Sequence, residues 1–270
     1  MPNIYIDRNT FKSRQGITSS ADDADILALL EGYSRAIDEY CNRTFHTQAE
    51  ARYYDGASLT LFLDRDLSAV VSLKTDDNGD GVYETTWATT DYLLLPASGY
   101  PKTAILVDRR SSGSKQSLAL GVQRGIEVTA KWAYLETLAA PATGNLNEDV
   151  DTSETGIDVV NGADFKAGQT IIIESEQMYI TGVAANTLTV IRAVNGTLAA
   201  THSAVPIYIY QYPLAIQEAL FLIASQAWNR RKMAIQGPSV TGRPAAPFAG
   251  VTPEARPLLQ PFRRIAFTGV

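Results

Sequence analysis

The chain has 270 residues, a net charge of −6 and a hydrophobic fraction of 45%, which is typical of one large or two small globular domains. The negative charge excludes a protein that holds nucleic acid over its whole surface by electrostatic attraction, and a single cysteine excludes an intrachain disulfide. The sequence has no apolar run long enough for a membrane helix and no signal core near its start, so we expect cytoplasmic synthesis without export.

The first part of the chain predicts an arm followed by a helix. Residues 1–18 are polar and are expected to form an arm or a short strand. Over residues 21–41 apolar side chains recur at steps of three and four, which indicates an amphipathic helix with Cys41 as a small core residue. Ser20 with Asp23 matches a capping box at its start, and Asn42 suits a left-handed residue at its end.

The apolar pattern then changes to a period of two, which is typical of strands whose two faces differ in polarity. Asp55-Gly56 indicates a hairpin turn between the first two strands, and the run from Asp76 to Gly81 indicates a turn between the third and the fourth. The predicted strands of this segment are 51–54, 59–63, 70–75, 82–87, 92–96, 104–107 and 126–132.

Residues 138–150 indicate a boundary, because alanine, proline, glycine and acidic residues replace the strand pattern there. Beyond it, the chain up to residue 212 is dense in β-branched residues, which predicts a small all-β module. Tight turns are expected at Asn161-Gly162 and Asn195-Gly196. The predicted strands of this module are 157–160, 170–173, 177–181, 187–191 and 205–210.

A second long helix is predicted over residues 213–233, with a proline at its first position and cationic residues at its end. Its apolar face includes Ile216, Leu220 and Ile223, and the helix at 21–41 is the expected cover for that face. Further on, Thr252-Pro253-Glu254 indicates the start of a short helix.

Two arginines, Arg263 and Arg264, interrupt the apolar end of the chain between Phe262 and Ile265. A charged pair inside an apolar strip suits docking into a partner protein better than packing within the same chain. The alternative interpretation is a solvated tail.

The residues that usually carry chemistry are sparse. The sequence has two histidines, His46 and His202, for which surface or capping positions are expected. It matches neither the phosphate-binding G-x-x-x-x-G-K-[ST] loop nor the G-x-S-x-G nucleophile motif. We therefore predict no catalytic residue, no cofactor and no metal site, and we do not expect an enzyme.

Two acidic groups are the exceptions that the sequence offers to that prediction. Asp76, Asn78 and Asp80 match the first half of a calcium loop, but the position that should supply its last acid is Trp87, so a hairpin turn is the favoured interpretation. Glu174 and Glu176 are two residues apart in a predicted strand and could form a glycosidase-like carboxylate pair. A solvated strand face is the favoured interpretation there.

The order of several segments resembles the bacteriophage head-to-tail connector family, also called adaptor or head-completion proteins. The segments that carry the resemblance are 22–26 with 36–43, 77–84 with Trp87 and 91–96, 128–134, 215–219 and 258–264. Residues 142–212 depart from the family pattern and resemble small β modules of phage tail-associated proteins. The matching residues are Phe165, Gly168, Ile171, Glu176, Met178, Ile180, Thr181, Leu188, Thr189, Val190, Arg192, Asn195, Gly196, Thr197 and His202.

The resemblance implies an α+β fold, a small helical bundle with a β-hairpin extension, into which this chain inserts an all-β subdomain. Residues 1–141 and 213–270 would form the adaptor core with a C-terminal docking tail, and residues 142–212 the inserted module. The candidate portal-docking residues are Leu258, Leu259, Phe262, Arg263, Arg264, Ile265 and Phe267.

The resemblance also implies a structural role in the virion neck. The family assembles in the bacterial host cytoplasm as a homo-oligomeric ring, a dodecamer, beneath the portal protein. The ring receives the next neck or tail protein, a stopper or tail terminator, and DNA passes through its lumen at ejection without sequence-specific binding; no membrane is involved.

Two other functions remain open from the sequence. The first is a carbohydrate- or receptor-binding virion protein, in which the β module would present exposed aromatic residues such as Tyr179, Tyr208 and Tyr210. The second is a hydrolase with a dispersed site, for which the sequence offers no motif.

Overall fold

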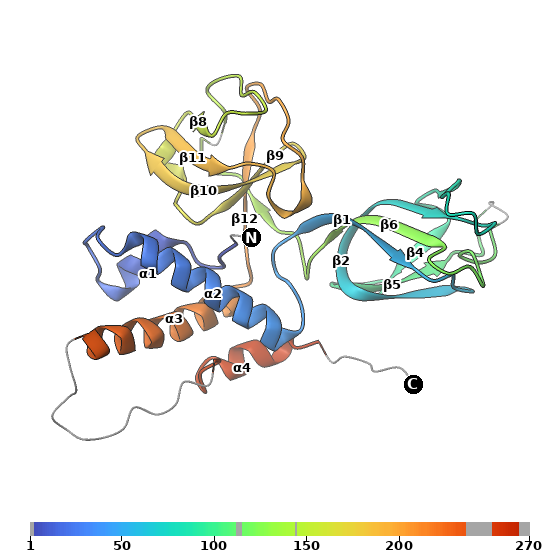
Figure 1. Ribbon diagram of the computed structural model, residues 1–270, viewed down its shortest axis with the longest axis horizontal. Helices are drawn as coiled ribbons and strands as arrows, with labels where there is room; N and C mark the ends of the chain where they lie inside the picture. Colours follow the sequence, from blue (N-terminus) through green and yellow to red (C-terminus); the bar gives the residue numbers. More distant parts are fainter. Residues whose placement is uncertain (1–2, 112–114, 144, 236–249, 265–270) are drawn as a thin grey trace. The chain divides into compact units, whose positions relative to one another are not determined.

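The computed structural model describes the chain except residues 1–2, 112–114, 144, 236–249 and 265–270 (Figure 1). The chain divides into two units. The helix-containing unit comprises Met1–Asn42, Thr137–Val194 and Leu198–Val270, and the all-β unit comprises Arg43–Glu136 and Asn195–Thr197. The predicted division into an adaptor core and an insertion at 142–212 stays a prediction about domain organisation.

The described residues form four α-helices, all in the helix-containing unit: α1 (Arg8–Gln15), α2 (Asp23–Cys41), α3 (Leu214–Ile235) and α4 (Arg256–Leu259), which a short 3₁₀ turn (Gln260–Phe262) follows. The two long predicted helices are confirmed as α2 and α3. They pack against each other, and Ile26 of α2 and Leu220 of α3 are fully buried. None of the described helices has the length and apolarity needed to cross a membrane.

Helix α1 was not predicted from the sequence, because it buries a single large apolar side chain, Phe11. Its start is stabilised instead by the Asp7 side chain, which accepts a hydrogen bond from the Thr10 backbone N–H at 2.8 Å. Phe11 packs edge-on against Phe221 of α3, with ring centroids 5.9 Å apart. The segment expected to be an arm or a strand is therefore partly a third helix that covers α3.

The ends of α2 agree only in part with the predicted caps. The N-cap position is occupied by Asp22 rather than Ser20, and the Asp22 side chain makes no capping hydrogen bond, so the predicted capping box is wrong. At the other end Asn42 adopts the predicted left-handed conformation, with φ of 51°, and its backbone N–H bonds to the carbonyls of Asp38 and Glu39.

Replacing Asn42 by alanine is expected to lower the free energy of unfolding by about 1 kcal/mol, because a Cβ without the asparagine amide disfavours the left-handed conformation. Asn42→Gly is the matched control and should stay within about 0.5 kcal/mol of the wild type. Urea unfolding of both variants checks the prediction, and equal losses in the two would contradict it.

The helix-containing unit also holds a six-stranded antiparallel sheet in the order β7-β12-β9-β10-β11-β8. All five strands predicted for the β module are confirmed, although their bounds differ by a few residues, and β7 adds a sixth. The strands are β7 (Leu138–Ala139), β8 (Gly156–Asp158), β9 (Thr170–Ile173), β10 (Glu176–Ala184), β11 (Thr187–Ile191) and β12 (Ile207–Tyr210). Their inward side chains form one apolar core, which includes Ile157, Ile171, Met178, Leu188 and Ile207.

The N-terminal arm ties this sheet to the helices. Asn3 is fully buried, and its side-chain oxygen accepts a hydrogen bond from Thr170 of β9 at 3.0 Å. The Tyr5 hydroxyl bonds to Asp38 of α2, and the backbone N–H of Arg8 bonds to the carbonyl of Ala167. The β module is therefore fixed to the helical layer by buried polar contacts.

The all-β unit contains the second six-stranded antiparallel sheet, in the order β1-β6-β2-β5-β4, with β3 paired to β2. Its inward side chains form a separate core around Trp132, Leu67, Leu73 and Ile105. The strands are β1 (Gln48–Tyr54), β2 (Thr60–Thr75), β3 (Thr85–Trp87), β4 (Tyr92–Leu95), β5 (Lys102–Val107) and β6 (Ile126–Trp132).

The predicted fold class, a small helical bundle with a β-hairpin extension, is wrong. The described residues are mostly β, in two six-stranded antiparallel sheets, and two of the four helices have only eight and four residues. The reason lies in the segment expected to be a hairpin extension: its strands bury enough apolar side chains to form their own core. Two long helices alone do not enclose a bundle core. In the helix-containing unit, that unit's own sheet and the N-terminal arm complete the core.

The hairpin predicted at Asp55-Gly56 is also wrong, since β1 pairs with β6 and not with β2. Asp55 and Gly56 instead contact the turn at residues 118–125, where the Gly56 N–H donates to the Val122 carbonyl at 2.8 Å. A Cβ on Gly56 would lie 1.7 Å from the Ala119 carbonyl oxygen. The glycine therefore allows a close approach between two segments rather than a tight turn.

Candidate functional site

Helix α4 anchors the C-terminal segment that was predicted to dock on a partner. Ala255 and Leu259 are fully buried in the helix-containing unit, where α4 contacts α3. After the short 3₁₀ turn, the Arg264 backbone N–H donates to the Cys41 carbonyl at the end of α2, at 2.8 Å. Cys41 itself is buried, as predicted.

The candidate docking residues thus fall into four groups. Leu259 packs inside the unit, and Arg263 is exposed, with its guanidinium carbon 5.1 Å from the centre of the Tyr40 ring. Ile265 and Phe267 lie outside the described residues. The half-buried members of the set are Leu258, Phe262 and Arg264.

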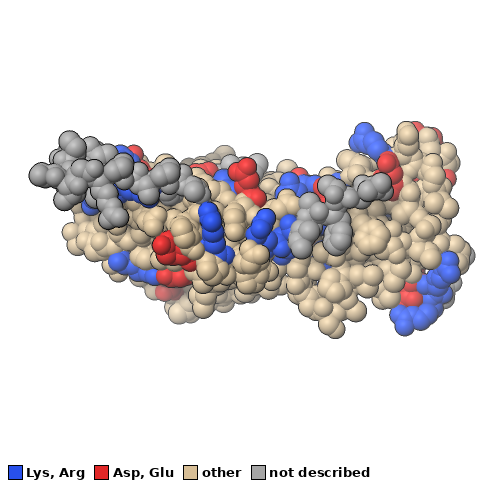
Figure 2. Space-filling view, turned by 90° about the horizontal axis from the view of Figure 1, so that it is seen from below, with Lys and Arg blue, Asp and Glu red and all other residues tan. Residues whose placement is uncertain are grey.

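Charged side chains of both signs are interspersed over the face that Figure 2 views. Within the helix-containing unit, charged side chains also form pairs, such as Arg14 with Glu218 at 2.8 Å and Arg231 with Asp25. Interspersed charges of opposite sign do not form the extended basic surface that tight nucleic-acid binding requires.

The loop between β2 and β3 places three carboxylates close together. One oxygen from each of Asp76, Asp80 and Glu84 lies within 4.8 Å of the others, which makes this group a geometric candidate for a cation. The Asp76 carboxylate, however, already accepts the backbone N–H groups of Gly79 and Gly81, at 2.6 and 2.8 Å. Although partial burial acts to raise the pKa of Asp76, these backbone hydrogen bonds outweigh it and lower the pKa.

The loop therefore closes on itself as a turn. Gly79 and Gly81 adopt φ values of 81° and 88°, which only glycine takes up readily. Trp87, at the position where a calcium loop needs its last acid, lies in β3 and donates its indole N–H to the Thr75 hydroxyl at 3.1 Å. The favoured hairpin interpretation agrees with this geometry, because β2 and β3 pair on either side of the loop.

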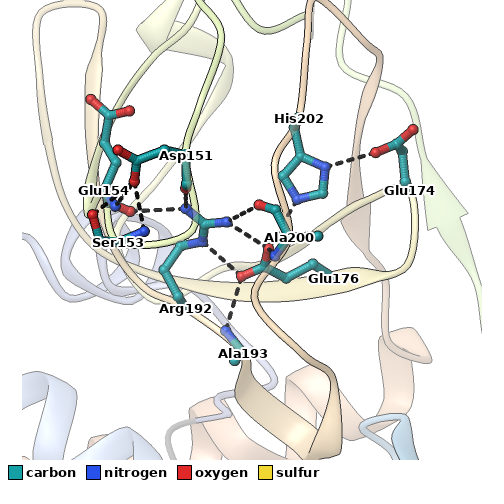
Figure 3. Close-up of polar contacts among 9 residues, drawn as sticks. All are labelled: Asp151, Ser153, Glu154, Glu174, Glu176, Arg192, Ala193, Ala200 and His202. Carbon is teal, nitrogen blue, oxygen red and sulfur yellow. Dashed lines mark hydrogen bonds and ion pairs between the residues drawn. The ribbon is translucent and has the colours of Figure 1, made fainter.

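The most extensive buried polar cluster that we find in the described chain joins Glu176, Arg192 and His202 in the β module (Figure 3). Arg192 donates to both carboxylate oxygens of Glu176, at 2.7 Å each. The same carboxylate accepts the backbone N–H of Ala193 at 3.1 Å and that of Ala200 at 2.9 Å. The Nε2 atom of His202 lies 2.9 Å from it. Glu176 and the His202 side chain are fully buried.

Arg192 is satisfied on its other side by backbone carbonyls. It donates to those of Asp151 at 2.6 Å, Glu154 at 3.0 Å and Ala200 at 2.6 Å. One guanidinium thus ties together the 150–155 segment, strand β10 and the segment that carries His202. A bidentate arginine–carboxylate pair with its remaining donors occupied is a stable arrangement for buried charge.

These contacts decide the charge of Glu176. Burial acts to raise the pKa of its carboxyl group, but the hydrogen bonds from Arg192, the Ala200 N–H, His202 and the Ala193 N–H outweigh burial and lower the pKa to about 2. Glu176 is therefore ionised near neutral pH. With every lone-pair direction used by a donor of the chain, it is poorly suited to act as a nucleophile or general acid.

The interpretation of Glu174 and Glu176 as a solvated strand face is wrong. Glu176 opens β10 with its side chain in the interior, whereas Glu174 lies in the turn between β9 and β10 with φ of 53°. The histidines were expected at surface or capping positions, and the surface alternative is wrong, because His46 and His202 are 3% and 2% exposed. Sequence periodicity could not reveal the cluster, because its members come from separate elements; the three appear together only among the residues that resemble phage β modules.

The aromatic residues that a carbohydrate-binding module would need are mostly buried. Tyr179 and Tyr210 are 4% and 6% exposed, and Tyr208 is 40% exposed. Burial raises the pKa of Tyr179, as expected for a phenol that is part of a core. Of the three tyrosines on which the receptor-binding interpretation depends, only Tyr208 is exposed.

No protein-family model matches the sequence, and no curated protein matches it. Among solved structures, the chain is similar to a chain of the neck of an empty GTA particle, a structure computed with C6 symmetry. The TM-score is 0.43 and the sequence identity 14%, over 98% of this chain and 93% of that chain. Similarity at this level leaves the family and the function of the present chain to be argued from its own residues.

Proposed function

We propose that the chain is a structural protein of the neck of a tailed phage or phage-like particle, a head-to-tail adaptor that joins the capsid to the tail. The order of its sequence segments, which resembles the connector family, supports this proposal. The most extensive buried polar cluster among the described residues is saturated by its own partners, which suits a protein that acts by assembly rather than by catalysis.

The anchoring of the C-terminal segment is the observation that carries the proposal. Ala255 and Leu259 bury the start of the segment, and the bond from Arg264 to Cys41 fixes the point at which residues 265–270 begin. Arg263 is exposed beside this point. A partner-binding segment whose attachment point is fixed loses less conformational entropy on binding than one attached through a flexible linker.

The proposed partners follow from this arrangement. The C-terminal segment would dock on the portal protein, and another surface would receive the next neck or tail protein. Identical subunits would form a ring through head-to-tail contacts, in which each presents two different surfaces; the proposed stoichiometry is twelve. A net charge of −6 suits a lumen that lets DNA pass without holding it.

A truncation after Arg264 tests the docking proposal. It keeps α4 and its buried contacts, whereas a truncation after Gly250 would remove Val251, Ala255 and Leu259 from the interior. We expect the Arg264 truncation to unfold at the wild-type temperature and to lose at least about 90% of its co-sedimentation with purified portal, since it loses Ile265 and Phe267.

Two variants of the full-length chain test whether portal binding depends specifically on the docking segment. Arg263→Glu should weaken portal binding in the full-length chain, whereas Arg110→Glu, which changes an exposed arginine of the all-β unit, should not. Full portal binding by the truncated protein would rule out the docking assignment. Electron microscopy of the wild-type mixture should show rings on portal, and monomers that never bind portal would overturn the adaptor proposal.

A further inference from the structure

We propose that His202 is a pH-dependent latch of the β module: the doubly protonated ring holds the β9–β10 turn through Glu174 and strand β10 through Glu176, and loss of one proton releases the turn. This inference concerns the module alone and does not depend on the proposed role in a virion neck.

Both ring nitrogens of His202 face carboxylates. Nδ1 lies 2.8 Å from a carboxylate oxygen of Glu174, and Nε2 lies 2.9 Å from one of Glu176 (Figure 3). An ionised carboxylate can only accept hydrogen bonds, so a nitrogen that faces one must carry a proton. Both contacts can therefore exist together only when the ring has two protons and a positive charge.

The main chain of His202 is held by two hydrogen bonds that do not involve the ring. The N–H of His202 donates to the Val150 carbonyl at 2.9 Å, and the N–H of Val150 donates to the His202 carbonyl at 2.8 Å. The attachment of the His202 backbone therefore does not depend on the protonation state of the ring. A ring that loses a proton must give up one of its two contacts without leaving the core.

The contact with Glu176 is the one that persists. The pKa of about 2 keeps that carboxylate ionised, and Arg192 with two backbone N–H groups holds it in place. The Glu174 side chain is 56% exposed, and His202 is its one side-chain partner that we find among the described residues. A neutral ring therefore keeps its proton on Nε2, and Nδ1 then faces Glu174 as a second acceptor.

Other charged groups around the ring do not replace this contact. Arg192 contacts the same Glu176 oxygen as the His202 ring, and its donors are used by that carboxylate and by backbone carbonyls. Asp151 and Glu154 belong to the adjacent 150–155 segment. The Asp151 carboxylate accepts from Ser153, and Glu154 meets Arg192 through its backbone carbonyl. The carboxylates that face the ring are therefore those of Glu174 and Glu176.

The backbone conformation of the β9–β10 turn determines how loss of the His202 contact would affect the structure. Glu174 adopts φ of 53°, a left-handed conformation that disfavours residues with a Cβ. Glu174 and Ser175 form the two-residue link between the paired residues Ile173 and Glu176. The His202 contact helps to hold Glu174 in this conformation, so its loss should let the turn sample others.

Nuclear magnetic resonance of the full-length chain tests the latch between pH 5.5 and 9. We expect the amide resonances of Glu174 and Ser175 to shift with the same midpoint as the His202 ring protons, and their hydrogen exchange to become at least about threefold faster once the ring is neutral. In Glu174→Gln, which changes an exposed side chain and should fold normally, the ring should still titrate while the turn exchanges rapidly at every pH.

Glu154→Gln is the control, since the Glu154 carboxylate makes no contact with the ring, and it should reproduce the wild-type titration. His202→Gln should abolish the pH response of the turn if it folds. Turn resonances that stay constant while the ring titrates would overturn the proposal. A ring that keeps one protonation state from pH 5.5 to 9 would overturn it as well.

Discussion

Replacing Arg192 by methionine is expected to lower the free energy of unfolding of the helix-containing unit by about 3–5 kcal/mol. The substitution keeps most of the side-chain volume but removes both bonds to Glu176, which is fully buried. The buried carboxylate would lose its bidentate partner, and three backbone carbonyls would lose their donor. Breaking a buried ion pair from one side is costly for this reason.

Hydrogen exchange of the β9, β10 and β11 amides in increasing urea measures this effect within the unit. Arg231→Met is the matched control, because Arg231 pairs with Asp25 at the surface, where both side chains are about half exposed, and it should change stability by less than about 1 kcal/mol. The double variant Glu176→Leu with Arg192→Met should recover part of the loss, since no unpaired charge remains. A loss below 1 kcal/mol in Arg192→Met would show that the cluster is not a structural centre of the module.

This cluster also marks the limit of what the sequence could predict. Helix α3 and strand β6 were predicted closely, because each buries one face against a core and therefore shows its period along the chain. Strand β2 was predicted as two strands, since Asp64 and Asp66 interrupt its apolar pattern. The structure keeps it continuous because its first half pairs with β5 and its second half with β6. The continuity of β2 therefore depends on pairing with strands from distant parts of the chain, which the local sequence pattern does not show.

The buried polar residues were harder to predict for the same reason. Glu176, Arg192 and His202 are separated by 16 and 10 residues and belong to different elements, so nothing in the local pattern relates them. Each taken alone is typical of a surface position, and a charged residue becomes a core residue only when its partner is supplied by another segment. The C-terminal segment shows the reverse case: its apolar Leu259, expected to contact a partner protein, packs inside the unit.

Lowering the pH from 5 to 2 is expected to remove up to about 3 kcal/mol of the stability of the helix-containing unit through Glu176 alone. The pKa of this group is about 2 in the folded chain, against an ordinary value of 4.5. A carboxyl group whose pKa is lower in the folded state stabilises the fold fully above its unfolded pKa. That contribution declines below about pH 4.5 and is lost as the pH falls through 2. The pKa of Asp151 in the same unit is also lowered, by hydrogen bonds from Ser153 and Glu154, and acts in the same direction.

The comparison with Glu176→Gln isolates this contribution from general acid unfolding. The variant should be less stable than the wild type at pH 7, because an amide cannot pair with Arg192 as a carboxylate does. Its stability should then fall less steeply between pH 4.5 and 2, since the group that takes up a proton on unfolding has been removed. Urea unfolding at half-unit pH intervals gives both slopes. Parallel slopes in the two proteins would mean that Glu176 titrates alike in the folded and unfolded chains, and the buried network would then contribute no pH-dependent stability.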